Sequence, residues 1–277
     1  MCVITKNKIR DFEKHLVCEE KTSSTVKKYV YDITAFAEWV GADKVDKNTV
    51  LQYKEKLISE YKPRSVNSII SSLNSYFEFV GHRECKVRTL KIQRQIFADN
   101  ELTKEEYKRL LKAAKDSKNE RMYYLMQTIC STGIRVSELR FITVDAVLKQ
   151  KACVRLKGKL RTVLLPKNLC KALMLYIRKN KIEKGAVFVT RSGKNLDRSN
   201  IWTYMKKLCR LADVPKDKVF PHNLRHLFAR TYYLIQKDIV RLADILGHSS
   251  INTTRIYTME TGDIHRKQIQ KLGLLQC

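Results

Sequence analysis

Apolar residues recur every three or four positions along most of this 277-residue chain, and this spacing limits it to a largely helical fold. In the first third of the chain, glycines at positions 41 and 81 end two such stretches, and Pro63 begins one. Residues 1–82 are therefore predicted to form a compact helical domain, with helices over 8–19, 25–40, 49–59 and 63–80.

The helical spacing is lost over residues 83–100, where basic residues alternate with small apolar ones. This segment is predicted to be a basic linker. Residues 101–277 then form a second domain, which begins with the capping-box sequence Thr103-Lys104-Glu105-Glu106.

The second domain contains one change of period. Ala152–Leu156 and Arg161–Leu165 alternate as strands do, and the connection over 157–160 predicts a β-hairpin. Helices resume over 168–179, 198–211 and 223–236. The predicted fold is mainly α with a small β-sheet, in two domains, of which the second is α+β.

The net charge of +27 favours a polyanionic partner, of which nucleic acid is the commonest. Residues 1–95 hold 18 basic and 12 acidic residues, so +21 of the charge lies in the rest of the chain. A membrane surface is a weaker candidate, because the basic residues are not gathered on one amphipathic helix.

The eight cysteines are scattered without a C-x-x-C pair, so no structural metal site is predicted. The first ten residues are too charged for a signal peptide, and no apolar run reaches membrane-spanning length. We expect a cytoplasmic protein with reduced thiols and no membrane partner.

Three motifs carry candidate chemistry. The first is Ser131-Thr132-Gly133-Ile134-Arg135-Val136-Ser137-Glu138-Leu139, in which an arginine follows a glycine turn. Taken alone, Arg135 is more simply an arginine at a helix start that pairs with a neighbouring acid.

The second motif places His222 and Arg225 three residues apart, hence on one face of a helix. H-x-x-R alone is usually a solvated helix face, but here it extends to H-N-L-R-H-L-F-A-R.

The third motif is L-G-H-S-S-I-N-T-T-R-I-Y-T, with His248 just past Gly247 and Tyr257 nine residues later. His248 could instead cap the preceding helix, and 238–257 could be a helix-turn-helix that reads DNA bases. Together, the two arginines, two histidines and tyrosine suit attack of a side chain on a phosphodiester: guanidinium groups bind phosphate oxygens, imidazoles transfer protons and the phenol is the nucleophile.

These motifs resemble those of the tyrosine recombinase (phage integrase) family, which includes the Xer-like site-specific recombinases. Leu227 stands where that family commonly has threonine. The helical first domain is similar in size and class to the family's SAM-like core-binding domain, which clamps DNA.

The resemblance implies a cofactor-free, metal-free reaction. Tyr257 would attack the backbone phosphorus, expel the 5′ oxygen and form a 3′-phosphotyrosyl intermediate. It further implies that Arg135, Arg225 and His248 stabilise the phosphate, that Glu138 helps to fix Arg135, and that His222 is the base.

The resemblance also implies a lysine in the hairpin turn that protonates the leaving oxygen. Alignment of the Lys-Gly pair selects Lys157, whereas counting backwards from Arg161 leaves Lys159 open. The predicted catalytic set is therefore Arg135, Lys157, His222, Arg225, His248 and Tyr257.

The implied partners are double-stranded DNA with inverted-repeat half-sites and a homo-tetramer formed on it, with accessory directionality or architectural proteins as further candidates. A last helix over 263–275 would dock on its own domain or on a neighbouring protomer. The sequence leaves open the target site and the outcome: integration, excision, inversion or dimer resolution.

Three other classes of protein remain alternatives. A type IB topoisomerase would relax DNA that lacks a target site, and a non-catalytic regulator would function without the Tyr257 hydroxyl. A basic RNA-binding protein fits the charge, but its usual aromatic-rich surface motifs are not seen.

Overall fold

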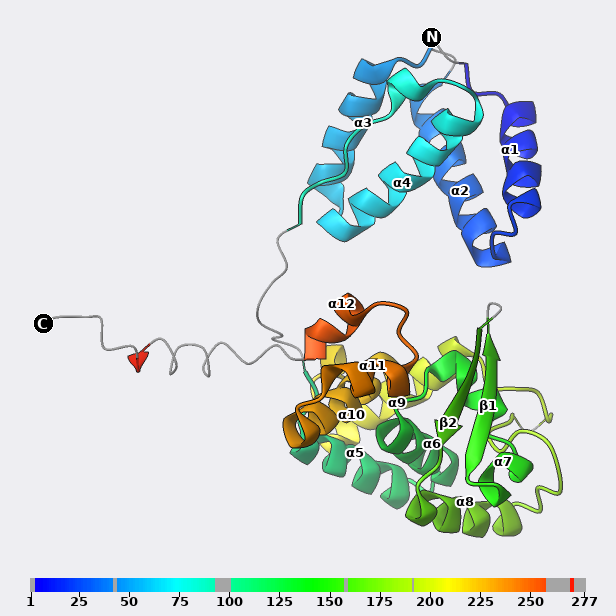
Figure 1. Ribbon diagram of the computed structural model, residues 1–277, viewed down its shortest axis with the longest axis vertical. Coiled ribbons are helices and arrows are strands. Elements are labelled where there is room, and N and C mark those ends of the chain that lie inside the picture. Colours follow the sequence, from blue (N-terminus) through cyan, green and yellow to red (C-terminus); the bar gives the residue numbers. More distant parts are fainter. Residues whose placement is uncertain are drawn as a thin grey trace, which may run out of the picture. The chain divides into compact units, whose positions relative to one another are not determined.

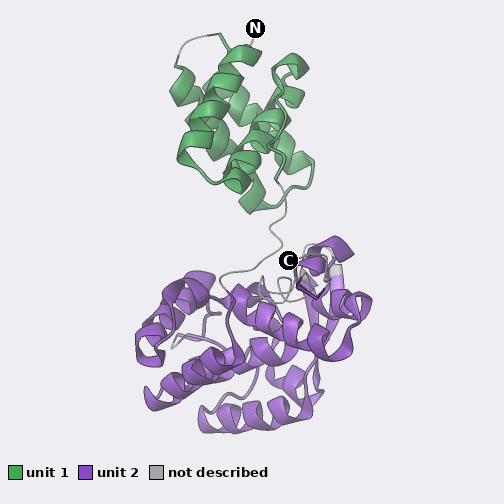
Figure 2. Cartoon of the chain, turned by 90° about the vertical axis from the view of Figure 1, so that its left-hand side faces the viewer, with its two compact units in different colours: residues 1–94 green, residues 95–277 purple. Residues whose placement is uncertain are grey.

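The computed structural model describes residues 3–41, 44–92, 101–156, 159–190, 192–257 and 270–271. The chain divides into two compact units, Met1–Arg94 and Gln95–Cys277 (Figure 2). The described residues are mainly helical with one two-stranded sheet, which confirms the predicted fold class.

The first unit is built from four α-helices and a short 3-10 turn within its described residues. They are α1 (Lys6–Cys18), α2 (Ser23–Val40), α3 (Lys47–Glu60), α4 (Pro63–Phe79) and η1 (Arg83–Cys85). Side-chain caps from Thr5, Thr22 and Asp46 begin the first three helices, and Pro63 occupies the first turn of α4. The apolar faces of all four helices meet in one core that includes Phe12, Ile33, Phe36, Ile70 and Phe77.

Part of the segment predicted as a linker packs on the first unit. Cys85 and Val87 are buried in its core. The side chains of Asn74 and Asn67 bind the backbones of Val87 and Leu90. Within 83–92, the chain is therefore a docked extension of this unit, and 93–100 lies outside the described residues.

The second unit surrounds a larger core. Its described elements are α5 (Lys104–Asp116), α6 (Glu120–Thr132), η2 (Val136–Phe141), α7 (Val144–Leu148), β1 (Lys151–Leu156), β2 (Lys159–Leu164), α8 (Lys167–Lys179), α9 (Arg198–Ala212), η3 (Lys216–Lys218), α10 (Pro221–Gln236), α11 (Ile239–Leu246), α12 (Ile251–Thr254) and η4 (Arg255–Tyr257) (Figure 1). The predicted capping box is present, with Thr103 and Glu106 binding each other's backbone N–H groups. In the part of the chain that the structure describes, no helix is both long and apolar enough to span a membrane.

The hairpin has a tighter connection than predicted. Leu156 pairs with Lys159 and Arg155 pairs with Leu160, so only positions 157 and 158 join the strands. The predicted four-residue connection over 157–160 is therefore wrong, because the ladder of backbone hydrogen bonds extends through Lys159 and Leu160. Ala152, Val154 and Val163 point into the core.

A separate apolar cluster forms where α10 packs against α11. It contains Ala229, Leu242, Leu246 and Tyr257. Helix α10 packs against both α6 and α11. It therefore brings Arg135, which follows α6, close to the residues that follow α11. The predicted helix over 263–275 lies outside the described residues, except for positions 270 and 271.

Candidate active site

Arg135 lies just after the glycine turn that ends α6. Gly133 adopts a left-handed backbone (φ +64°), and a Cβ there would lie 2.5 Å from the ring of Phe228 in α10. The glycine thus allows α10 to pack close to the residues before Arg135. Both the backbone N–H of Arg135 (2.9 Å) and its Nη1 (3.0 Å) donate to Glu138, which is buried.

The Glu138 carboxylate is ionised despite its burial. Burial would raise its pKa, but hydrogen bonds from the Arg135 backbone and from Arg161 lower the pKa below its ordinary value. A charged acceptor therefore holds the Arg135 guanidinium in place.

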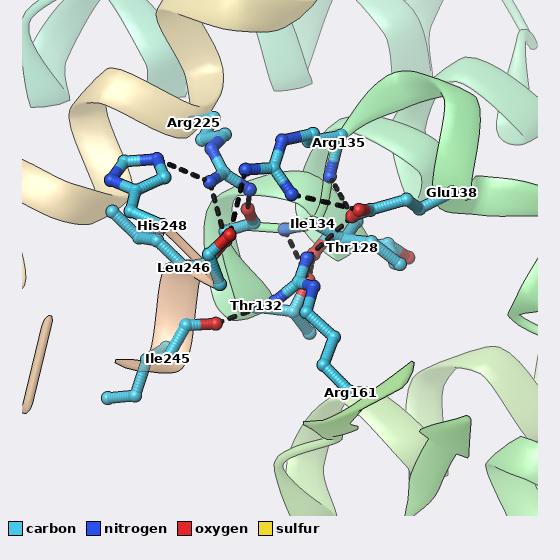
Figure 3. A network of polar contacts seen from close by, with 12 residues as sticks. Thr128, Thr132, Ile134, Arg135, Glu138, Arg161, Arg225, Ile245, Leu246 and His248 are labelled. Carbon is cyan, nitrogen blue, oxygen red and sulfur yellow. Dashed lines mark hydrogen bonds and ion pairs between the residues drawn. The ribbon is translucent and has the colours of Figure 1, made fainter. Parts of the chain in front are cut away.

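Arg225 comes from the first half of α10 and is almost completely buried. It donates to the carbonyls of Gly133 (2.5 Å) and Leu246 (2.8 Å), and its Nη2 lies 2.9 Å from Nε2 of His248 (Figure 3). Burial and the charge of Arg135 lower its pKa to about 10, so the group remains cationic at neutral pH.

His248 follows the Gly247 turn at the end of α11. Because Arg225 can only donate, Nε2 of His248 is the acceptor, and the ring proton is on Nδ1, which donates to Oγ1 of Thr254 (2.8 Å). Burial, then the charges of Arg225 and Arg135, lower the pKa of His248 to about 4. The imidazole is therefore neutral at physiological pH.

Tyr257 is buried at the end of η4, with 2% of its surface exposed. Its ring lies nearly parallel to that of His248, 6.1 Å away, and meets His226 edge-on at 4.8 Å. Burial raises the pKa of the phenol, against the opposing charges of Arg225 and Arg135. The hydroxyl makes no hydrogen bond of ordinary geometry within the described residues, although Arg225 is close enough to lower its pKa.

His222 is at the surface on the first turn of α10, where it stacks edge-on with His226 at 4.5 Å. Desolvation by the surrounding protein, then the charges of Arg225 and Arg135, lower its pKa. It is therefore a neutral imidazole at physiological pH, as a proton acceptor must be.

The structure thus brings five of the six predicted site residues into one cluster: Arg135, His222, Arg225, His248 and Tyr257. The sixth, Lys157, lies outside the described residues, and only the backbone of the alternative, Lys159, is described.

Two further residues contact this cluster or the acid that holds Arg135, and the sequence did not predict a role for either. His226 separates His222 from Tyr257, and Arg161 binds Glu138. The signal for His226 was its place in the H-N-L-R-H string. No group of three His, Cys, Asp or Glu side chains suited to a metal ion occurs among the described residues.

Comparison with known proteins agrees with this geometry. Residues 100–262 match the Phage integrase family, and residues 9–84 match its N-terminal SAM-like domain. The chain belongs to the phage integrase family. This integrase-family protein is a tyrosine recombinase, an enzyme of site-specific DNA cleavage and rejoining, so the predicted resemblance and enzyme class are confirmed.

Similar curated proteins span nearly the whole chain. Tyrosine recombinase XerA from Pyrococcus furiosus is 30% identical, covering 97% of this integrase-family chain and 94% of its own. Tyrosine recombinase XerA from Thermococcus kodakarensis is 31% identical, with 97% and 96% covered.

Solved structures share the fold. A crystal structure of XerA recombinase, 26% identical, matches with a TM-score of 0.54 over 99% of this chain and all of that one. A lambda integrase tetramer bound to a Holliday junction is 19% identical and matches with a TM-score of 0.76, covering 92% of this chain and 77% of that one.

Proposed function

We propose that this protein recombines DNA through Tyr257, which attacks a backbone phosphorus, expels the 5′ oxygen and becomes joined to the 3′ phosphate. The observation that carries the proposal is the placement of Tyr257 against His248 and Arg225, a buried cation. Because the phosphotyrosyl bond conserves the energy of the broken bond, a new 5′ hydroxyl can reverse the step and rejoin the strand.

Arg135 and Arg225 stabilise the negative charge that grows on the non-bridging oxygens. Their guanidinium groups are prepositioned by Glu138 and by main-chain carbonyls, so little reorganisation is needed as the charge develops. His248, neutral in the free protein, is the third phosphate ligand in the proposal.

The phenol needs a base, because an unperturbed tyrosine has a pKa of about 10 and burial raises this one further. His222, a neutral imidazole on α10, takes the proton once Tyr257 has left its contact with His226, which lies between the two rings in the described arrangement. Lys157, which comes between β1 and β2 in the sequence, protonates the leaving 5′ oxygen, with Lys159 as the alternative donor.

Catalysis requires a change in the segment that bears the nucleophile. Arg225 and Tyr257 have 1% and 2% of their surface exposed, so a phosphate cannot reach both in the described arrangement. The residues after His248, which include Tyr257, must therefore move when DNA binds, and this movement breaks the ring contact between Tyr257 and His226.

The proposed partner is double-stranded DNA with inverted-repeat half-sites. In this proposal the second unit and the helical first unit, for which the sequence predicts the bounds 1–82, both contact the duplex as a clamp. The basic segment 83–100 connects them, and its first part, 83–92, packs on the first unit. Two duplexes cut on both strands need four active sites, so the assembly on DNA is a homo-tetramer in the cytoplasm, aided in some reactions by accessory proteins.

Trapping the covalent intermediate tests the proposal. A nicked DNA site loses a short fragment on cleavage, so the phosphotyrosyl adduct accumulates and appears as a slower band on a denaturing gel. The wild-type protein should form the adduct on sites taken from the inverted repeats that flank its gene. Absence of an adduct on all such sites would contradict the proposal.

A further inference from the structure

Arg161, on β2, links three parts of the second unit. Its Nη1 donates to the carbonyl of Ile245 in α11 (2.7 Å), and its Nη2 donates to Glu138 in η2 (2.5 Å). The side chain is largely buried, with 16% of its surface exposed. A hairpin strand is thereby fixed to both the acid that holds Arg135 and the helix that precedes His248.

The end of α11 binds three arginines through three consecutive carbonyls. Ile245 accepts from Arg161 and Leu246 from Arg225 (Figure 3). Gly247 accepts from Arg135. The last carbonyls of a helix lack intrahelical partners and carry its partial negative charge. Three guanidinium groups at this end are therefore favourable, and each one fixes the position of the helix end.

Gly247 and Arg161 also fit closely together. Gly247 has a left-handed backbone (φ +63°), and a Cβ there would lie 2.4 Å from Cδ of Arg161. The aliphatic part of Arg161 thus occupies the space beside the turn that leads into His248. Displacement of Arg161 frees this turn on the side that faces β2.

Arg161 differs from Arg135 in exposure. Both η nitrogens of each arginine bind protein oxygens, and Nε of Arg161 is buried without a partner within the described residues. Arg135 has 37% of its side-chain surface exposed, against 16% for Arg161. Arg135 can therefore meet a phosphate, whereas Arg161 has no exposed donor pair to offer.

We propose that Arg161 is a positioning residue of the active site, which holds Glu138 and the Ile245–His248 turn so that Arg135, Arg225 and His248 converge on one phosphate. This role rests on the proposed function. Arg161 affects how the protein binds the phosphate, and it does not assist protonation of the leaving group. Lysine cannot replace it, because one ammonium cannot reproduce the fork that spans a carboxylate and a carbonyl.

The first test compares rates of adduct formation at saturating protein for wild type, Arg161→Gln and Arg161→Lys. We expect both variants to be slower by about 100-fold, the usual cost of a small misplacement of catalytic groups. Val163→Ala is the matched control: it weakens the same strand through the core but leaves the arginine contacts intact. It should lower the melting temperature and keep the rate within about threefold of wild type.

A second substrate distinguishes two roles for Arg161: positioning the residues that bind the phosphate, and assisting protonation of the leaving group. With sulfur in place of the 5′-bridging oxygen, the leaving group needs no proton. Arg161→Gln should remain slow on this substrate. Full recovery, or a rate on normal DNA equal to that of the Val163→Ala protein, would overturn the inference.

Hydrogen exchange of the free protein provides a readout that does not require activity. In Arg161→Gln, peptides covering 133–141 and 239–248 should exchange severalfold faster, whereas α8 should be unchanged. If wild-type protein forms no adduct, the proposed function fails. Hydrogen exchange then still tests whether Arg161 positions the residues at 133–141 and 239–248. Unaltered exchange at 239–248 would refute its positioning role.

Discussion

Arg225 donates from Nη2 both to the carbonyl of Leu246 and to the ring of His248, 2.9 Å away. One guanidinium nitrogen thus holds the end of α11 and determines which nitrogen of His248 carries its proton. The side chains proposed to bind the phosphate are therefore arranged before any DNA is present, as electrostatic stabilisation of a transition state requires.

Arg225→Lys should slow adduct formation by about 100-fold or more, because an ammonium cannot bind Gly133, Leu246 and a phosphate together. The matched control is Arg230→Lys on the same helix, where lysine can keep the ion pair with Glu101. Melting curves of both variants establish that they fold. A rate for Arg225→Lys within a few-fold of wild type would show that Arg225 is misassigned.

Stability of the second unit should fall as the pH decreases from about 6.5 to 4. His226 and His248 each have a pKa lowered to about 4, mainly by burial, from an ordinary value of 6.5. Over this range the unfolded chain binds protons that the folded chain does not, so acid favours unfolding. Urea unfolding can be followed through Trp202 after Trp39→Phe.

The control for the pH dependence is His226→Phe, which removes one of the histidine rings with a lowered pKa but keeps an aromatic contact for Tyr257. The slope of the unfolding free energy against pH should be smaller in this variant between pH 6.5 and 5. An identical slope in both proteins would show that His226 is not buried as a neutral ring.

Lys157→Ala should slow cleavage of normal DNA and recover on the substrate with a 5′-bridging sulfur, because a thiolate leaves without a proton. Lys159→Ala is the matched variant two residues away, on the first position of β2. Recovery confined to Lys159→Ala would show that the alternative alignment of the lysine is correct.

DNA binding should weaken steeply with salt. About ten neutralised phosphates correspond to a slope of log affinity on log salt of about −9. Residues 96–277, expressed alone, should bind weakly because they hold most of the charge, and the full chain should bind much more tightly. Equal affinity of the two proteins would argue against a clamp.

The helical periodicity predicted the main helices well, since Gly41, Pro63 and the Thr103 capping box are local signals that packing did not override. The hairpin connection was harder, because Lys159 and Leu160 have no turn-specific chemistry and only the cross-strand pairing places them in β2.

The candidate site was predictable where chemistry and motif coincide, as at Arg135, Arg225 and His248. The contacts of Arg161 were not, since its partners lie 23 and 84 residues away in the sequence. The burial of Tyr257 could not be predicted from the sequence either, because it depends on how α10 and α11 pack rather than on the residues next to it.

The most direct test of the account is to identify the residue that becomes linked to DNA. Adduct from a nicked site is digested with protease and nuclease, and the modified peptide is sequenced by mass spectrometry, with Tyr257→Phe as the matched control. We predict a nucleotide on Tyr257 in the wild type, no adduct in Tyr257→Phe, and nearly equal DNA binding by both. A nucleotide on another residue, or cleavage by Tyr257→Phe, would contradict it.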